Sequence, residues 1–70
     1  MINNEKILDF IIFCIEEYKN AKELSGEEVY RIFNENGVLD FLNDNFSLLH
    51  TFGKEYVLDT IDEFIQNKLS

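Results

Sequence analysis

Residues 7–18, which read ILDFIIFCIEEY, decide how this chain folds. Their apolar side chains recur at helical spacing, at Ile7, Leu8, Ile11, Cys14, Ile15 and Tyr18. One face of an α-helix has this spacing, whereas a half-buried strand alternates apolar and polar residues. The pattern predicts a helix that begins after Asn3 or Asn4, ends near Lys22 and turns this stripe toward the core.

A second helix is predicted to begin at Ser25-Gly26-Glu27-Glu28, which matches the S-x-x-E capping box. In this motif the serine hydroxyl and the glutamate carboxylate each accept a hydrogen bond from a backbone N–H that the helix leaves unpaired. The helix is expected to end at Asn36-Gly37, because glycine readily takes the left-handed conformation that closes a helix.

Two further helices complete the expected fold. The third runs from about Val38 to His50, although the weak helix formers at 43–45 could bend it, and the fourth follows the joint 51–53 and runs to about Lys68. Short joints make successive helices neighbours. We therefore expect one all-α domain over residues 1–70, a small bundle of four short helices.

The negative charge of the chain limits the kinds of molecule that it can bind. Fourteen acidic against six basic residues give a formal charge of −8, which repels phosphate backbones and anionic membranes and favours a partner with a basic surface. No nucleic-acid binding is expected. The hydrophobic fraction of 46%, with seven Phe and three Tyr, predicts a folded domain, as a monomer or a weak homodimer.

Cysteine usage and hydropathy favour a cytoplasmic protein. The single cysteine, Cys14, cannot form an internal disulfide, and it lies within an apolar run where a thiol usually acts as a small core residue. That run, 10–15, is far shorter than the roughly 20 residues that cross a bilayer, and no basic segment of a secretory signal precedes it. We expect no contact with a membrane.

His50 is the only histidine and the first candidate for chemistry. It stands at the expected end of the third helix, where an imidazole can bond a free backbone carbonyl, and no motif places a nucleophile beside it. The structural role is therefore preferred to a catalytic one. With no phosphate loop, metal ligand set or nucleophile–base pair in the sequence, we expect neither an enzyme nor a cofactor.

His50 and five other residues are candidates for binding a partner. Four carboxylates lie on one side of the fourth helix, opposite its apolar stripe, at Glu55, Asp59, Asp62 and Glu63. They form either a solvated face or a surface for a basic protein, and no histidine is spaced to complete a metal site with them. Phe13 lies away from the apolar stripe of the first helix. A small bundle favours cover by a neighbouring helix, yet Phe13 is the best single candidate for a partner contact.

Several stretches resemble a family of short bacterial proteins of unknown function. They are LDFIIFCIE at 8–16, LSGEEVY at 24–30, and the Leu-His-Thr-x-Gly motif at 49–53, followed by Tyr56 and by IDE at 61–63. Members of this family are often encoded beside larger proteins, some of which resemble ADP-ribosyltransferase-type toxins. The resemblance implies an accessory or antitoxin-like role for this chain.

Three functional hypotheses follow. The leading one is a non-enzymatic, acidic module that binds a larger, neighbour-encoded protein. The second is a nucleic-acid mimic that occupies the basic groove of a DNA-binding protein, against which six scattered lysines and arginines argue. The third, an enzyme subunit, would need His50 to lie in a cleft against a carboxylate.

Overall fold

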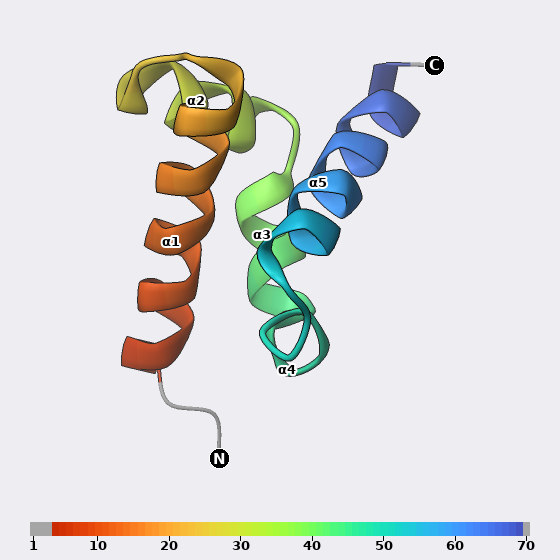
Figure 1. Cartoon of the computed structure of the whole chain (residues 1–70). Helices are drawn as coiled ribbons and strands as arrows, with labels where there is room; N and C mark the ends of the chain where they lie inside the picture. Colours follow the sequence, from red (N-terminus) through yellow and green to blue (C-terminus); the bar gives the residue numbers. More distant parts are fainter. Residues whose placement is uncertain (1–3, 70) are drawn as a thin grey trace.

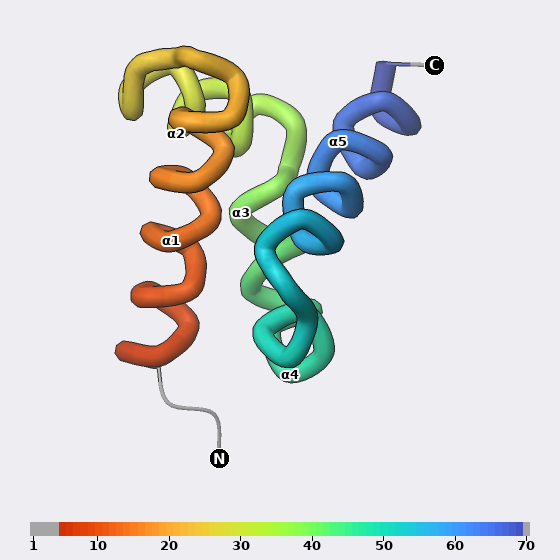
Figure 2. The backbone as a smooth tube through the Cα atoms, viewed as in Figure 1, coloured from red at the N-terminus to blue at the C-terminus, as the bar shows by residue number. Residues whose placement is uncertain are grey.

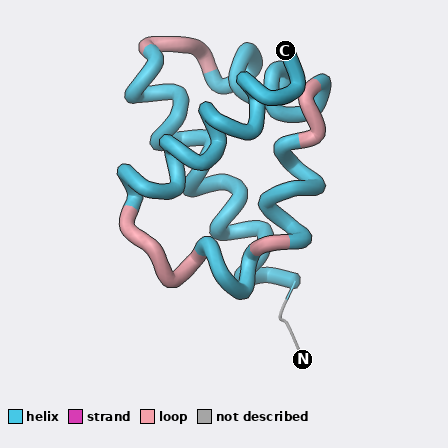
Figure 3. Tube along the Cα trace, turned by 90° about the vertical axis from the view of Figure 1, so that its right-hand side faces the viewer, coloured by secondary structure: helices cyan, strands magenta, loops and turns pink. Residues whose placement is uncertain are grey.

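The computed structural model describes residues 4–69 and contains five helices connected by short joints (Figures 1 and 3). They are α1 (Asn4–Lys22), α2 (Gly26–Glu35), α3 (Val38–Asp44), α4 (Phe46–Leu49) and α5 (Lys54–Leu69). None of the described residues forms a strand, so the predicted all-α fold is confirmed. In Figures 1 and 2, α1 and α5 flank α3, α2 lies across the C-terminal end of α1, and α4 lies at the opposite end of the molecule.

The joint between α1 and α2 combines two caps. Of the residues proposed to precede α1, Asn4 is its first helical residue, and Asn3 lies outside the described residues. At the other end Glu23 adopts a left-handed φ of 56°, and the Leu24 N–H donates to the Lys19 carbonyl at 3.0 Å. This is the Schellman pattern, with glutamate in the position that glycine usually takes.

The predicted capping box at the start of α2 is confirmed. Ser25 Oγ accepts from the Glu28 N–H at 3.1 Å, and the Glu28 carboxylate accepts from the Ser25 N–H at 3.2 Å. The hydrogen bond from the Ser25 backbone lowers the pKa of Glu28. The capping box therefore stabilises α2 locally, independently of its tertiary contacts. Such local stabilisation is needed because a helix of only ten residues is marginally stable on its own.

The segment predicted as one helix from Val38 to His50 is divided into α3 and α4. Asn45 separates them with φ −111° and ψ 15°, outside the helical region, and its side-chain amide donates to the Phe41 carbonyl at 2.8 Å. The same carbonyl also accepts the Asn45 backbone N–H at 3.0 Å, and such local bonds of a short amide side chain favour the end of a helix. The expectation of one continuous helix is wrong, and the break allows α4 to turn Phe46 toward α1.

The core lies where α1, α2, α3 and α5 meet. Its fully buried side chains are Cys14, Val29, Phe33, Val38, Leu42 and Ile61. Burial raises the pKa of the Cys14 thiol to about 12, which keeps it protonated and unreactive at neutral pH, as predicted for a core residue. Gly37, at φ 72°, provides the left-handed residue that joins α2 to α3.

Candidate functional site

Two open pockets lie along α1, one on either side of an ion pair that joins α1 to α5. Lys54 Nζ at the start of α5 lies 3.3 Å from Glu17 Oε1 of α1. Glu17 precedes the α1 residues of one pocket and follows those of the other. The chain order thus places the ion pair between a polar pocket and an aromatic pocket.

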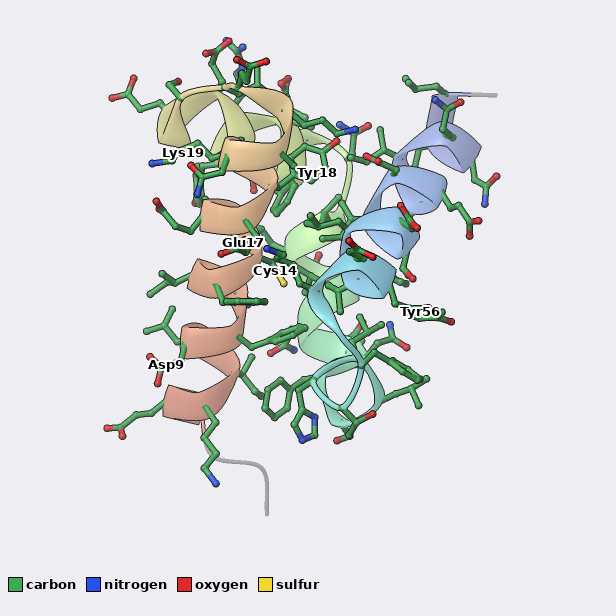
Figure 4. All side chains as sticks on the ribbon, viewed as in Figure 1. Asp9, Cys14, Glu17, Tyr18, Lys19 and Tyr56 are labelled. Atoms are coloured by element: carbon green, nitrogen blue, oxygen red, sulfur yellow. The ribbon has the colours of Figure 1, made fainter. Side chains whose placement is uncertain are left out.

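The polar pocket has a volume of about 330 Å³ and lies between the C-terminal half of α1 and α5. Its lining residues are Tyr18, Ala21, Lys22, Glu55, Leu58, Asp59 and Asp62. Tyr18 extends from α1 toward α5 (Figure 4), and its hydroxyl donates to Asp62 Oδ1 at 2.9 Å. Lys22 Nζ donates to the other oxygen, Oδ2, at 3.0 Å. Asp62 therefore ties α5 to α1 with both of its oxygens.

Tyr18 acts in this pocket as a hydrogen-bond donor. Its burial, and next its hydrogen bond and proximity to the Asp62 carboxylate, raise the pKa of the phenol to about 12. The hydroxyl consequently keeps its proton at neutral pH and cannot serve there as a general base. Tyr18 also packs edge-on against Phe33 of the core, with ring centroids 5.2 Å apart, which fixes its orientation.

The aromatic pocket has a volume of about 450 Å³ and lies where the N-terminal half of α1 meets α4 and the joint before α5. Its lining residues are Lys6, Asp9, Phe10, Phe13, Phe46, His50 and Phe52. The Phe46 ring contacts Phe10 edge-on at 5.5 Å and stacks on His50 at 4.5 Å. Phe13 and Phe52 are 43% and 40% exposed, so solvent reaches both rings.

His50 makes the helix-end hydrogen bond that its position predicts. Its ring Nδ1 lies 2.6 Å from the Phe46 carbonyl, and its backbone N–H donates to the same carbonyl at 3.0 Å. A carbonyl oxygen only accepts, so Nδ1 carries a hydrogen, and in the neutral ring Nε2 is the acceptor. His50 thus holds the end of α4 and also forms part of the aromatic pocket.

The four acidic candidates on α5 separate into three roles. Glu55 and Asp59 are exposed and line the polar pocket. Asp62 is half-buried and engaged by Tyr18 and Lys22. Glu63 is exposed and is not part of the pocket lining. The carboxylates therefore do not act as one face, because Asp62 is turned toward α1.

Phe13 is brought together with His50 in the aromatic pocket, whereas the acidic candidates Glu55, Asp59 and Asp62 line the polar pocket. Its exposure shows that the neighbouring helices do not cover it, so the expectation of cover is wrong. Sequence reasoning also missed Phe52 and the Tyr18 hydroxyl. An aromatic residue within a short Thr-Phe-Gly joint was the available signal for Phe52, whereas the Tyr18–Asp62 bond spans 44 positions and has no local signal.

The described residues offer neither a metal ligand set nor an unpaired buried side chain. Over residues 4–69 no group of three or more His, Cys, Asp or Glu side chains is arranged to hold a metal ion. In the same part of the chain, every buried side-chain nitrogen or oxygen has a hydrogen-bond partner. None of the helices there has the length and apolar character needed to span a membrane.

The fold and the α1–α5 interface define a small all-α domain with two surface pockets. Residues 9–68 match the family described as "Protein of unknown function (DUF3791)", and the chain belongs to this family. The predicted membership in a family without an assigned function is thereby confirmed. No curated protein and no solved structure matches the chain.

Proposed function

We propose that this domain is a non-enzymatic protein-binding module that docks on a basic surface of a larger partner through the α1–α5 interface. One observation carries the proposal. Glu55 and Asp59 line an open pocket, and within residues 4–69 neither carboxylate takes part in an ion pair, whereas Asp62 beside them is already engaged. Two uncompensated carboxylates in a pocket suit a lysine or arginine from another protein.

The charge of the whole chain supports the same class of partner. At −8 the domain attracts a basic protein from a distance and accelerates their encounter, while the pocket carboxylates determine the orientation of docking. Tyr18 lines the pocket, but its ring is buried and Lys22 Nζ already lies 5.5 Å from the ring centroid, so it is not open to a partner. An arginine suits the two unpaired carboxylates, since its guanidinium pairs with carboxylates through two hydrogen bonds.

The specific form of the proposal is an antitoxin-like role. A larger protein encoded by a neighbouring gene would be the partner, and this domain would hold it inactive by covering a basic cleft. The family resemblance suggests this role, and the domain's acidity and small size suit it. The nucleic-acid mimic is less well supported, because Lys22 and Lys54 interrupt the negative charge along the interface.

The test is co-purification of this chain with the product of the neighbouring gene, followed by charge reversal. Glu55→Lys with Asp59→Lys is expected to weaken the complex at least tenfold, and binding by the parent is expected to decrease as salt increases. The control is Glu63→Lys, an exposed residue of the same helix that is not in the pocket lining. Equal loss in the control, or no loss in the double variant, would contradict docking at this pocket.

The enzyme alternative has its own test. His50 lines a pocket that also contains Asp9, so a catalytic histidine would require activity of the complex to depend on the imidazole. A variant His50→Asn, whose amide can still donate to the Phe46 carbonyl, separates the two roles. Loss of an activity in a stably folded His50→Asn protein would support the enzyme alternative over the binding module.

A further inference from the structure

We propose that an amphipathic helix of the partner lies along α1 across both pockets, with an apolar side chain in the aromatic pocket and a lysine or arginine about two helical turns away in the polar pocket. This inference rests on the proposed function and specifies the partner's recognition element. It also assigns a binding role to the aromatic pocket, which the charge-based proposal above leaves without one.

The aromatic pocket suits an apolar side chain. Two exposed rings, Phe13 and Phe52, border it, and the Phe10–Phe46 contact lies in its lining with His50 stacked against it. Exposed aromatic rings beside a pocket are typical of surfaces that bind another protein, because a buried aromatic contact contributes strongly to affinity. Only Lys6 and Asp9 bring full charges to this lining, and they are of opposite sign.

The spacing of the two pockets along α1 matches one face of a helix. Phe13 lines the aromatic pocket and Ala21 the polar pocket, roughly eight residues further along α1, which corresponds to about 12 Å at 1.5 Å per residue. On a partner helix lying along the interface, positions i and i+7 or i+8 span a similar distance and share one face. The Glu17–Lys54 ion pair lies under the stretch between them.

Charge decides between a basic partner and a second copy of this chain. Two copies that meet at this interface would bring together their uncompensated Glu55 and Asp59 carboxylates and a charge of −8 each. A basic helix instead places a cation between those carboxylates. The interface is thus complementary to a basic amphipathic segment and unfavourable for self-association.

Two synthetic helical peptides of identical composition test the geometry. One carries a central Leu with Arg seven residues to either side, which places the three side chains on one face in both chain directions. The other moves each Arg to five residues from the Leu, which turns the cations away from that face. Titration into the isotope-labelled domain is followed by NMR, and the ring signals of His50 report on the aromatic pocket because the chain has only one histidine.

The first peptide is expected to shift the His50 ring signals and to bind at least tenfold more tightly than the second. Phe13→Ala and Phe52→Ala should each weaken its binding about tenfold, and Leu48→Ala, which removes an exposed side chain outside the pocket lining, should not. All three side chains are exposed, and far-UV circular dichroism checks that the variants stay folded.

Three outcomes would overturn the inference. They are equal affinity of the two peptides, no saturable shift for either at about 1 mM, and unchanged binding in both phenylalanine variants. None of them contradicts the proposed function by itself, because co-purification with the partner and its loss on reversing Glu55 and Asp59 are measured independently. If co-purification or the charge reversal fails while the first peptide still binds selectively, the inferred binding of a basic amphipathic helix is retained. The proposed larger, neighbour-encoded partner is then rejected.

Discussion

The two ends of α1 are held to the rest of the domain by different physical means, the polar end against α5 and the aromatic end against α4. At the polar end, Tyr18 and Lys22 of α1 hold one carboxylate of α5 through directional hydrogen bonds. At the aromatic end, α1 is held by ring contacts of Phe46, which itself stacks on His50. Hydrogen bonds fix orientation at a modest net free energy, whereas buried aromatic area contributes more free energy with less directional control. The aromatic end should therefore carry the stability and the polar end the alignment.

The largest expected effect comes from removing the ring that supports the aromatic end. Phe46→Ala should lower the free energy of unfolding by about 3–4 kcal/mol, because the ring is buried and contacts Phe10 and His50. Urea unfolding measures this, with Leu48→Ala as the control, since Leu48 is 59% exposed and should change stability by less than about 0.5 kcal/mol. A loss below about 1 kcal/mol in Phe46→Ala would remove the distinction between the two ends.

Alkaline pH should weaken the fold about as strongly. The pKa of Cys14 is raised from 9.0 to about 12 and that of Tyr18 from 10.0 to about 12, so the folded state holds both protons more tightly than the unfolded state. Stability is then complete below pH 9 and is lost as pH rises toward 12, by on the order of 4 kcal/mol at pH 11 for the two groups together.

Urea unfolding at several values between pH 8 and pH 11 tests this dependence. Cys14→Ala and Tyr18→Phe should each reduce the slope of stability against pH, because each removes one group that titrates differently in the two states. Tyr56→Phe, which changes an exposed hydroxyl, is the matched control. A free energy of unfolding that stays constant over this pH range in the parent protein would contradict the burial of the Cys14 and Tyr18 side chains.

Tyr18→Phe isolates the polar end at neutral pH. Loss of the hydrogen bond to Asp62 should cost about 1 kcal/mol, since the ring stays packed against Phe33 and only the hydroxyl is removed. A double-mutant cycle with Asp62→Ala, which removes the acceptor, measures the coupling of the two side chains. Additive effects within about 0.3 kcal/mol would mean that the bond does not align the helices as described.

The smallest effect is expected for His50→Ala, at about 0.5–1 kcal/mol. The imidazole is exposed, and the change removes one hydrogen bond to the Phe46 carbonyl and one stacking contact. His50→Asn should restore part of the loss by donating to the same carbonyl. A melting temperature equal to the parent's in His50→Ala would show that the ring does not hold the end of α4.

The sequence predicted features that depend on local spacing and missed those that depend on the meeting of distant segments. The α1 stripe, in which only Leu8 is exposed, at 57%, the Ser25 capping box and the Gly37 joint follow from residues a few positions apart. The break at Asn45 was indicated only by weak helix formers, because several short polar residues there could equally have continued the helix. The acidic side of α5 was misjudged at Asp62, since no helical wheel reveals that Tyr18 and Lys22 approach it from another helix.

The joining of the first helix to the last has a consequence for the order of folding. Contacts within and between successive helices close short loops, whereas Tyr18 and Asp62 are 44 positions apart, so their contact closes most of the chain and is expected to form late. Both pockets need α1 together with residues from 46 onward, and release of α5 alone would abolish the polar one. Amide hydrogen exchange in α5 should then report how often the domain opens, and a partner bound across the interface should slow that exchange in proportion to its occupancy.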